Sequence, residues 1–421
     1  MLRKLSVRCL CVSMLTSAIW LPAQAAPAPD SAVKSPKVVL VSIDGLRWQE
    51  VFHGADPEIL RNSQFIRHSD ELSTLPTQPQ QLMPFLHQTI AHQGMLVGDR
   101  RRGSAMQVSN PWHFSYPGYN ELLSGYPDPA INSNGKIANP NVTVLEWLNQ
   151  QPGMAQQVAA FGSWDVLPFI LNTERSKLPV NAGFAPMNEQ MAGPLTPQLK
   201  LLNQLQRQTP SPWAAVRLDV FTQQFALEYL TQKKPRLLYI AYGETDDFAH
   251  DGQYDQYLKA IRRTDGFIKE LWQQLQSDPF YAGQTTLLIS TDHGRGDNAN
   301  SWQHHASGRA IAGYMKKLKN FGNGVSGSDE IWLAALGPQI PARGLVATQQ
   351  PWSQSQVAST VAELLGYDYQ AFQYKAAAAI PLGDSSAASA QVAQRASTKT
   401  TTTTTTATAS GTNTVTVLTP Q

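Results

Sequence analysis

Acidic and imidazole side chains follow three apolar runs of this sequence. Asp44 follows "KVVLVSI", Asp246 and His250 come after "RLLYIAY", and Asp292 and His293 come after "QTTLLIS". Asp and His are ligands of borderline metal ions such as zinc, and carboxylates that crowd together need a cation to offset their repulsion. The sequence therefore predicts a metal site, provided that the three runs end at one place in the fold.

The spacing within each pair favours joint ligation. Asp246 and His250 are four residues apart, so one turn of helix would bring both to the same side. Asp292 and His293 are adjacent, and Gly294 permits a tight turn after them. Both side chains of this second pair can therefore point into the site.

One more imidazole is expected from "WQHHASG", which contains His304 and His305. With it, the candidate ligands are sufficient for two metal ions rather than one.

The elements that position these residues are expected to alternate along the chain. Apolar runs of the kind found in buried parallel strands cover residues 37–43, 236–242, 284–291 and 330–337, and helical patterns cover 80–92, 142–149, 212–232 and 254–276. Such alternation predicts an α/β fold with a mostly parallel central sheet and helices on both faces. Ligands of such sheets bind beyond the carboxyl ends of the strands, where the predicted metal site lies.

The chain has 421 residues, of which 42% are hydrophobic, and a formal net charge of +2. This composition provides a sizeable core, and the near-neutral balance argues against a surface for duplex nucleic acid or a polybasic membrane patch. The oligomeric state cannot be inferred from the sequence.

The first residues resemble an export signal. Residues 1–25 combine a basic start, a short apolar stretch and the small-residue site "AQA", which predicts a cleaved signal peptide and a periplasmic or secreted protein without stable membrane insertion. The only cysteines, Cys9 and Cys11, lie in this segment. We expect a linker at 26–36, a catalytic domain at 37–384 with a possible substrate-facing cap at about 162–210, and a disordered Thr-rich tail at 385–421.

Four motifs together resemble the alkaline phosphatase superfamily, in its type I phosphodiesterase/nucleotide pyrophosphatase-like branch, which shares its metalloenzyme domain with phosphoglycerate mutases. They are "VSIDGLR", "FSYPGYNELLSG", "GETDDFAHDG" and "STDHG" with a downstream histidine. The resemblance implies an alkaline phosphatase-like fold with two divalent ions at the strand ends, zinc in the first place and manganese as the alternative. The motif that sulfatases need for formylglycine is missing, which disfavours sulfatase chemistry.

Carried over by motif, the resemblance assigns the ligands. Asp44, Asp292 and His293 would hold one ion. Asp246 and His250 would hold the other together with His305, although His304 and Asp247 are alternatives to His305 and Asp246. The predicted metal ligands are Asp44, Asp246, His250, Asp292, His293 and His305.

The motif "HFSYPGYNELLSG" resembles the nucleophile turn of the same family and places Ser115 as the catalytic nucleophile. A metal ion can activate such a hydroxyl, and the helix that follows directs its N-terminus at an anionic phosphate. Asn134 is the candidate for binding a phosphoryl oxygen, with Asn139 behind it; both lie in a turn-rich loop where an Asn can also be purely structural.

Together with these residues, the resemblance implies an exported metal-dependent phosphatase or phosphodiesterase. It would cleave a small-molecule phosphomonoester or phosphodiester through a phosphoserine intermediate. The alternatives are a phosphotransferase or mutase of the same superfamily and a non-catalytic metal-stabilised binding protein.

Overall fold

The computed structural model describes residues 35–382. The predicted signal peptide and nearly all of the linker precede this part of the chain, and the predicted tail follows it, so these predictions lie outside the described residues. None of the helices within residues 35–382 is long and apolar enough to cross a membrane.

The main sheet has eight strands within the described residues, in the order β10-β2-β9-β7-β1-β6-β4-β5. Strand β1 pairs in parallel with β7 on one side and β6 on the other, and β6 continues in parallel to β4 and β5. Strand β9 is antiparallel to both β7 and β2. The strands are β1 Lys37–Ile43, β2 Met95–Val97, β4 Val158–Gly162, β5 Val180–Ala182, β6 Leu237–Tyr242, β7 Thr285–Ser290, β9 Leu333–Leu336 and β10 Gly344–Leu345.

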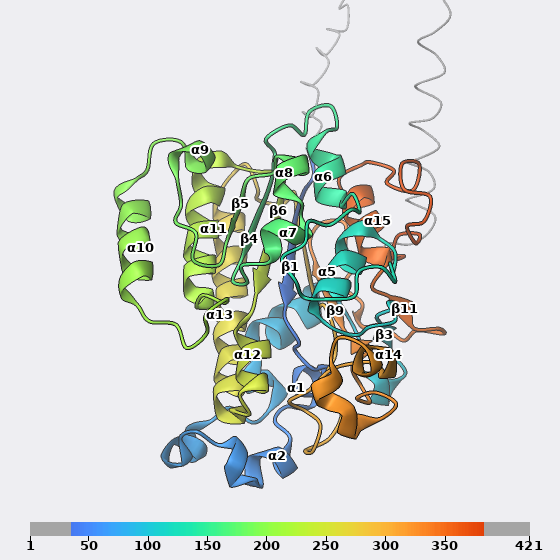
Figure 1. Ribbon diagram of the computed structural model, residues 1–421. Helices are drawn as coiled ribbons and strands as arrows, with labels where there is room; N and C mark the ends of the chain where they lie inside the picture. Colours follow the sequence, from blue (N-terminus) through green and yellow to red (C-terminus); the bar gives the residue numbers. More distant parts are fainter. Residues whose placement is uncertain (1–34, 383–421) are drawn as a thin grey trace, which may run out of the picture. The chain divides into compact units, whose positions relative to one another are not determined.

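Helices cover both faces of this sheet (Figure 1). Val39 and Val41 of β1 belong to the core that includes α11 and α13, whereas Val38 and Leu40 belong to the core that includes α5 and α15. Successive side chains of a strand point to opposite faces, so a strand that is apolar throughout is buried on both sides. The predicted fold class, a mostly parallel sheet between two layers of helices, is confirmed.

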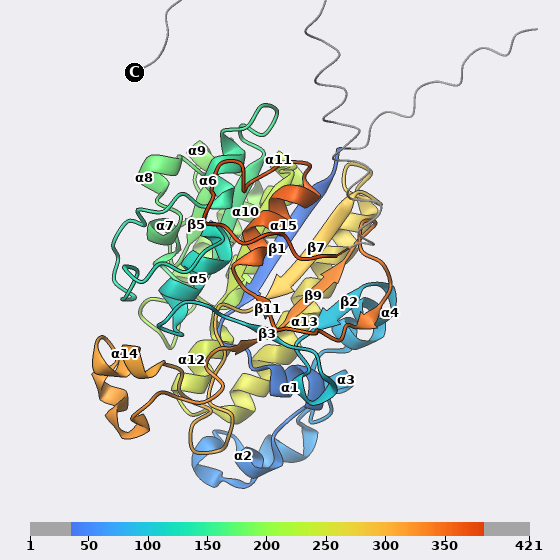
Figure 2. The ribbon, with the colours of Figure 1, turned by 90° about the vertical axis from the view of Figure 1, so that its right-hand side faces the viewer.

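The α-helices are α1 Trp48–His53, α2 Pro57–Arg61, α3 Pro79–Leu82, α4 Ala91–Gln93, α5 Ser115–Ser124, α6 Val144–Asn149, α7 Leu167–Ile170, α8 Thr173–Ser176, α9 Glu189–Ala192, α10 Pro197–Gln208, α11 Asp219–Lys233, α12 Glu244–His250, α13 Tyr254–Ser277, α14 Gly308–Ala312 and α15 Gln356–Leu364. Figure 2 shows the four strands β1, β7, β9 and β2 side by side, with α12 and α14 beyond one end of the sheet.

Three predicted elements differ from the structure. The predicted helix 80–92 is broken into α3, a π-helical turn at Leu86–Ile90 and α4, because Pro84 interrupts it. The carboxylate of Asp265 accepts hydrogen bonds from the backbone N–H groups of Phe85 and Leu86, at 2.8 and 3.0 Å. These two N–H groups at the start of the π-helical turn therefore have a hydrogen-bond partner.

The predicted strand 330–337 is split at Trp332. Strand β8 (Glu330–Ile331) pairs with β3 (Met106–Gln107) in a small second sheet completed by β11 (Trp352–Ser353), while β9 joins the main sheet. The buried indole of Trp332 donates a hydrogen bond to the carbonyl of Leu46. The predicted helix 212–232 begins only at Asp219, and Val216 instead forms a β-bridge with Trp164.

The segment 162–210, predicted as a possible cap, also extends the main sheet. Its strand β5 lies at the sheet edge beside β4, and its helix α10 packs against α11. Whether this segment also contacts a substrate stays a prediction.

A buried ion pair lies directly behind the loop that follows β1. Arg47 and Glu50 are both fully buried, and the Arg47 guanidinium donates to both carboxylate oxygens of Glu50 and, at 2.7 Å, to the carbonyl of Gly296. Tyr254 donates a hydrogen bond to Glu50 at 2.7 Å. This network joins the start of α1, the start of α13 and the loop after β7.

Replacing Arg47 with methionine leaves the Glu50 carboxylate buried without its cation. We therefore expect Arg47→Met to lower the free energy of unfolding, measured by urea denaturation, by about 3–5 kcal/mol. The control is Lys259→Met, which removes the partner of the half-exposed Glu71 and should cost about 1 kcal/mol or less. Equal losses in the two variants would contradict a structural role for the buried pair.

Candidate metal centre

The candidate ligands follow three neighbouring parallel strands. Asp44 comes directly after β1, α12 with Asp246 and His250 follows β6, and Asp292 with His293 follows β7. Because the carboxyl ends of parallel strands meet at one edge of the sheet, these residues converge there. Two groups of three residues have ligand atoms close enough to share an ion, and together they comprise the six predicted ligands.

Group 1 consists of Asp44, Asp292 and His293, all buried. The Nε2 atom of His293 lies 3.4 Å from Asp44 Oδ1 and 3.3 Å from Asp292 Oδ2. Burial and the neighbouring carboxylates raise the pKa of Asp44 and that of Asp292 above the usual range. Burial alone would lower the pKa of His293, but the carboxylates, Asp292 first, outweigh it and raise the pKa to about 9.

Group 2 consists of Asp246, His250 and His305. His250 Nε2 lies 3.1 Å from Asp246 Oδ2 and 3.0 Å from His305 Nε2. Burial would raise the pKa of Asp246, but the charges of His250 and Arg295 outweigh it and hold the pKa well below the usual value. Burial and the charge of His293 lower the pKa of His305 well below 6.5.

The two groups adjoin each other. The imidazole rings of His293 and His305 stack with centroids 3.7 Å apart, and His293 Nε2 lies 3.8 Å from Asp246 Oδ1. The structure therefore brings all six predicted ligands into one continuous cluster rather than into two separate sites.

The alternatives left open by the sequence lie outside the two groups. His304 packs edge-on against Phe321, and burial followed by the charge of Arg295 lowers its pKa to about 4. Burial and the charge of Asp246 raise the pKa of Asp247 to about 9. Neither residue shares a group with His250, so the geometry favours His305 over His304 and Asp246 over Asp247.

Ser115 is the first residue of α5 and lies beside group 1. Its Oγ atom is 3.3 Å from His293 Nε2. Helix α5 comes close to the loop after β7 at Gly118, where a Cβ atom would collide with the carbonyl of Asp292. The glycine in "SYPG" therefore allows the predicted nucleophile to lie against the metal-ligand cluster.

The two candidate asparagines have different surroundings. Asn134 Oδ1 accepts a hydrogen bond from the backbone N–H of Tyr116 at 2.9 Å, one residue beyond Ser115, and its Nδ2 has no hydrogen-bond partner within residues 35–382. Asn139 is fully buried, and its Nδ2 donates to Asn120 and to the carbonyl of Ile170. Asn139 is therefore a structural residue, whereas Asn134 keeps a free donor beside the start of α5.

Several contacts around the cluster were not anticipated from the sequence. Tyr119 donates to Asp44 Oδ2 at 2.9 Å, and Gln354 Nε2 donates to the carbonyls of Thr291 and Asp292 at 3.0 and 2.8 Å. Tyr119 follows Ser115 by one helical turn, a spacing that could have indicated a shared face. Gln354 follows the ligands by about sixty residues, and no local pattern indicates it.

Arg295 was also missed, although it lies only two residues after His293. Its guanidinium is fully buried and pairs with Asp246 Oδ1.

Arg175 has a structural role. It pairs with Glu146 and donates to the carbonyls of residues 139–141, so it stabilises the loop that carries Asn139.

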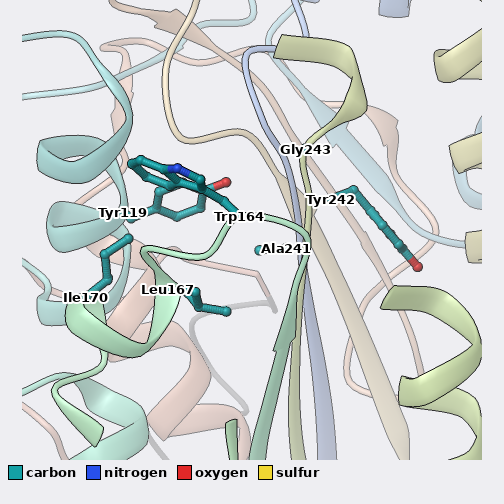
Figure 3. A pocket seen from close by; sticks show the side chains of 7 residues that line it. All are labelled: Tyr119, Trp164, Leu167, Ile170, Ala241, Tyr242 and Gly243. Carbon is teal, nitrogen blue, oxygen red and sulfur yellow. The ribbon is translucent and has the colours of Figure 1, made fainter. Parts of the chain in front are cut away.

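A small cavity lies next to the cluster (Figure 3). It is lined by Tyr119, Trp164, Leu167, Ile170, Ala241, Tyr242 and Gly243. The indole of Trp164 lies near the ring of Tyr119, with centroids 6.3 Å apart, while the side chain of Tyr242 extends to the other side of the strands. The cavity is apolar and narrow, and Tyr119 connects it to Asp44.

The chemistry of the two groups fits divalent ions. Asp44 Oδ1 and Asp292 Oδ2 are buried acceptors without a hydrogen-bond partner in the described part of the chain, and such atoms are costly to bury unless a cation compensates them. Carboxylate oxygens and imidazole nitrogens suit zinc and manganese. Residues Asp44, Asp292 and His293 could hold one ion, and Asp246, His250 and His305 a second.

Residues 131–313 match the family model described as type I phosphodiesterase / nucleotide pyrophosphatase. Among curated proteins, none matches this chain.

The solved structures similar to this chain include wild-type alkaline phosphatase PafA, with 11% identity, coverage of 79% of this chain and 96% of that chain, and a TM-score of 0.49. They also include murine ectonucleotide pyrophosphatase/phosphodiesterase 5 in complex with AMP, with 15% identity, coverage of 79% and 95%, and a TM-score of 0.44. Ps i-CgsB in complex with k-i-k-neocarrahexaose has 15% identity, coverage of 83% and 75%, and a TM-score of 0.49.

The family match covers five of the six predicted ligands and Asn134, while Asp44 and Ser115 lie before its first residue. The predicted resemblance to type I phosphodiesterases/nucleotide pyrophosphatases is confirmed by the match over residues 131–313.

Proposed function

We propose that this protein is an exported two-metal phosphohydrolase that cleaves a small-molecule phosphate ester through a phosphoserine intermediate at Ser115. The observation that carries this proposal is the position of the Ser115 hydroxyl, which lies 3.3 Å from His293 beside two adjoining groups of Asp and His ligands. The family match adds support, because it names a phosphodiesterase family. Export rests only on the N-terminal segment of the sequence.

The six predicted ligands would form two metal sites. Asp44, Asp292 and His293 would hold one ion next to Ser115, and Asp246, His250 and His305 would hold the other. When bound, divalent ions supply Lewis acidity, which lowers the pKa of a contacting hydroxyl or water and stabilises charge on phosphoryl oxygens. Zinc is the proposed metal, with manganese as the alternative.

The start of α5 provides the phosphate-binding surface. The positive end of the helix dipole there favours an anion. Asn134 Oδ1 is already used by the backbone N–H of Tyr116, and this contact leaves its Nδ2 free to donate to a phosphoryl oxygen. Asn134 therefore remains the proposed substrate-binding residue.

The reaction then proceeds in two displacements. The Ser115 oxygen attacks phosphorus and gives up its proton to water, and the bond from phosphorus to the leaving-group oxygen breaks as that oxygen takes up a proton from water. Water next attacks the phosphoserine, which releases phosphate or a phosphomonoester and restores the hydroxyl. Ser115 lies at a fixed position because the close approach of Gly118 to Asp292 orients its helix.

The substrate class can be tested with two chromogenic esters. Metal-loaded protein should hydrolyse p-nitrophenyl phosphate, bis-p-nitrophenyl phosphate or both, and the ratio of the two kcat/KM values would show the preference for a monoester or a diester. If neither ester is hydrolysed above the rate of a Ser115→Ala control, the protein would instead be a binding protein.

The metal count and the choice of histidine can be tested together. Purified mature protein should contain close to two divalent ions per chain by elemental analysis. His305→Ala should lose activity and about one ion, because alanine cannot replace the imidazole of His305 as a ligand of the second ion. The matched control His304→Ala should keep both ions, since His304 lies outside the two groups. The reverse pattern would place the ligand at His304.

The nucleophile can be tested by substitution and by trapping. Ser115→Ala should lower kcat by about 10³-fold or more while both ions stay bound, because Ser115 is the attacking group and is not needed for ligation. Acid quenching of wild-type turnover, followed by peptide mass spectrometry, should find phosphate on Ser115. Near-normal turnover by Ser115→Ala would mean that water attacks the substrate directly.

A further inference from the structure

The side chain of Arg295 joins all parts of group 2. Its Nη1 atom pairs with Asp246 Oδ1, and its Nη2 atom lies 3.3 Å from His250 Nδ1. The same guanidinium donates to the carbonyl of Trp302 through Nε at 3.0 Å and to the carbonyl of Gln303. These carbonyls belong to the loop that delivers His305. A single fully buried cation thus contacts two ligands of group 2 and supports the third.

Group 1 has no comparable partner. Within residues 35–382, no Lys or Arg forms an ion pair with Asp44 or Asp292, and each of these carboxylates has one buried oxygen without a hydrogen-bond partner. Group 1 therefore has two carboxylates without a Lys or Arg partner in the described part of the chain, whereas the one carboxylate of group 2 pairs with Arg295. A divalent ion gains more attraction from the first arrangement than from the second.

The contact with His250 increases this difference. A guanidinium can only donate hydrogen bonds, and Arg295 Nη2 lies against His250 Nδ1, while His250 Nε2 faces Asp246 and His305. The positive charge of Arg295 therefore lies against two of the three residues that would hold the second ion.

Space around the guanidinium is restricted, so Arg295 cannot easily move aside. Gly45, with φ of +57°, lies against it: a Cβ atom there would be 2.7 Å from Arg295 Nη1 and 2.6 Å from Asp246 Oδ1. The two carbonyl contacts hold the other side of the guanidinium. The cation therefore stays next to Asp246.

We propose that Arg295 makes the two groups unequal, so that group 1 binds its divalent ion tightly and group 2 binds a second ion more weakly and exchanges it. This inference rests on the proposed two-ion function. In this arrangement Arg295 is a positioning residue, because it acts on the metal through Asp246 and His250 and through the loop that carries His305.

The first test measures zinc binding without an activity assay. Full-length mature protein is stripped with a chelator, and the binding of Zn²⁺ is followed by isothermal titration calorimetry and by competition with a chromophoric chelator. Wild-type protein should bind two ions, the second at least about tenfold more weakly than the first. Asp246→Asn should remove only the weaker ion, and Asp292→Asn should remove the tighter one.

The second test changes Arg295 itself. Arg295→Gln removes the charge but keeps a donor for one loop carbonyl, and it should tighten the weaker site by about tenfold or more. Arg295→Lys is the matched control, because it keeps the charge and should leave the two affinities unequal. Circular dichroism and thermal unfolding would show whether each variant is folded; if Arg295→Gln does not fold, the two asparagine variants decide.

The outcomes separate this inference from the proposed function. Two ions of equal affinity in the wild-type protein, loss of the tighter ion in Asp246→Asn, or unchanged or weaker binding in Arg295→Gln would each overturn the role of Arg295 and leave a two-ion enzyme possible. A wild-type protein that binds one ion or none would overturn the two-ion function as well.

Discussion

Repulsion among buried carboxylates is the constraint on which the functional end of this fold depends. Asp44, Asp246 and Asp292 follow three adjacent parallel strands, so the sheet itself forces them together. Burying an uncompensated carboxylate costs several kcal/mol. The sheet can therefore carry this cluster only if cations, imidazolium groups or hydrogen-bond donors offset the charge, and most of the features around the site provide one of these.

The donors come from elements that are distant in sequence. Tyr119 of α5 donates to Asp44, and the backbone N–H of Gly45 donates to Asp292 Oδ1 at 3.1 Å. Thr245 donates to the carbonyl of Asp44 at 2.6 Å, and Gln354 holds the carbonyl of Asp292. These bonds fix the backbone of the ligands more than they neutralise their carboxylates. Asp44 and Asp292 each keep an oxygen without a donor, which is the arrangement expected of a site that is completed by a metal ion.

The sequence was sufficient to predict those parts of the site that local spacing determines. The pairs Asp246–His250 and Asp292–His293 depend on one helical turn and on adjacent residues, and the runs before them are unmistakable buried strands. The choice between His304 and His305 could not be made from spacing, because a loop rather than a regular element presents them. The same limit applies to Arg295 and Gln354, whose contacts depend on how that loop and the segment before α15 pack.

Errors in the predicted fold have similar causes. Pro84 interrupts a segment whose apolar pattern is helical, and the predicted strand 330–337 divides between two sheets at Trp332, whose indole is held by the carbonyl of Leu46. In each case the hydrophobic pattern was identified correctly, but one residue with a particular backbone or packing requirement decided where the element ended. Hydrophobic periodicity reports which face is buried and does not report such local interruptions.

The predicted metal ligands are held in position in two ways, by regular elements or by the contacts of a loop. Asp44, Asp292 and His293 extend directly from the ends of strands, and Asp246 and His250 lie on one short helix, so their relative positions follow from the backbone. His305 lies in the irregular chain between β7 and α14 and is held instead by individual contacts: its Nδ1 atom lies 3.2 Å from the carbonyl of His113, its ring stacks on His293, and Arg295 bonds the two carbonyls at residues 302 and 303. A loop whose geometry is set by a buried cation can hold a ligand as precisely as a strand does. The positive charge of that cation then lies close to the metal ion that the ligand binds. The support of His305 and the reduced negative charge of group 2 are therefore two consequences of the same side chain.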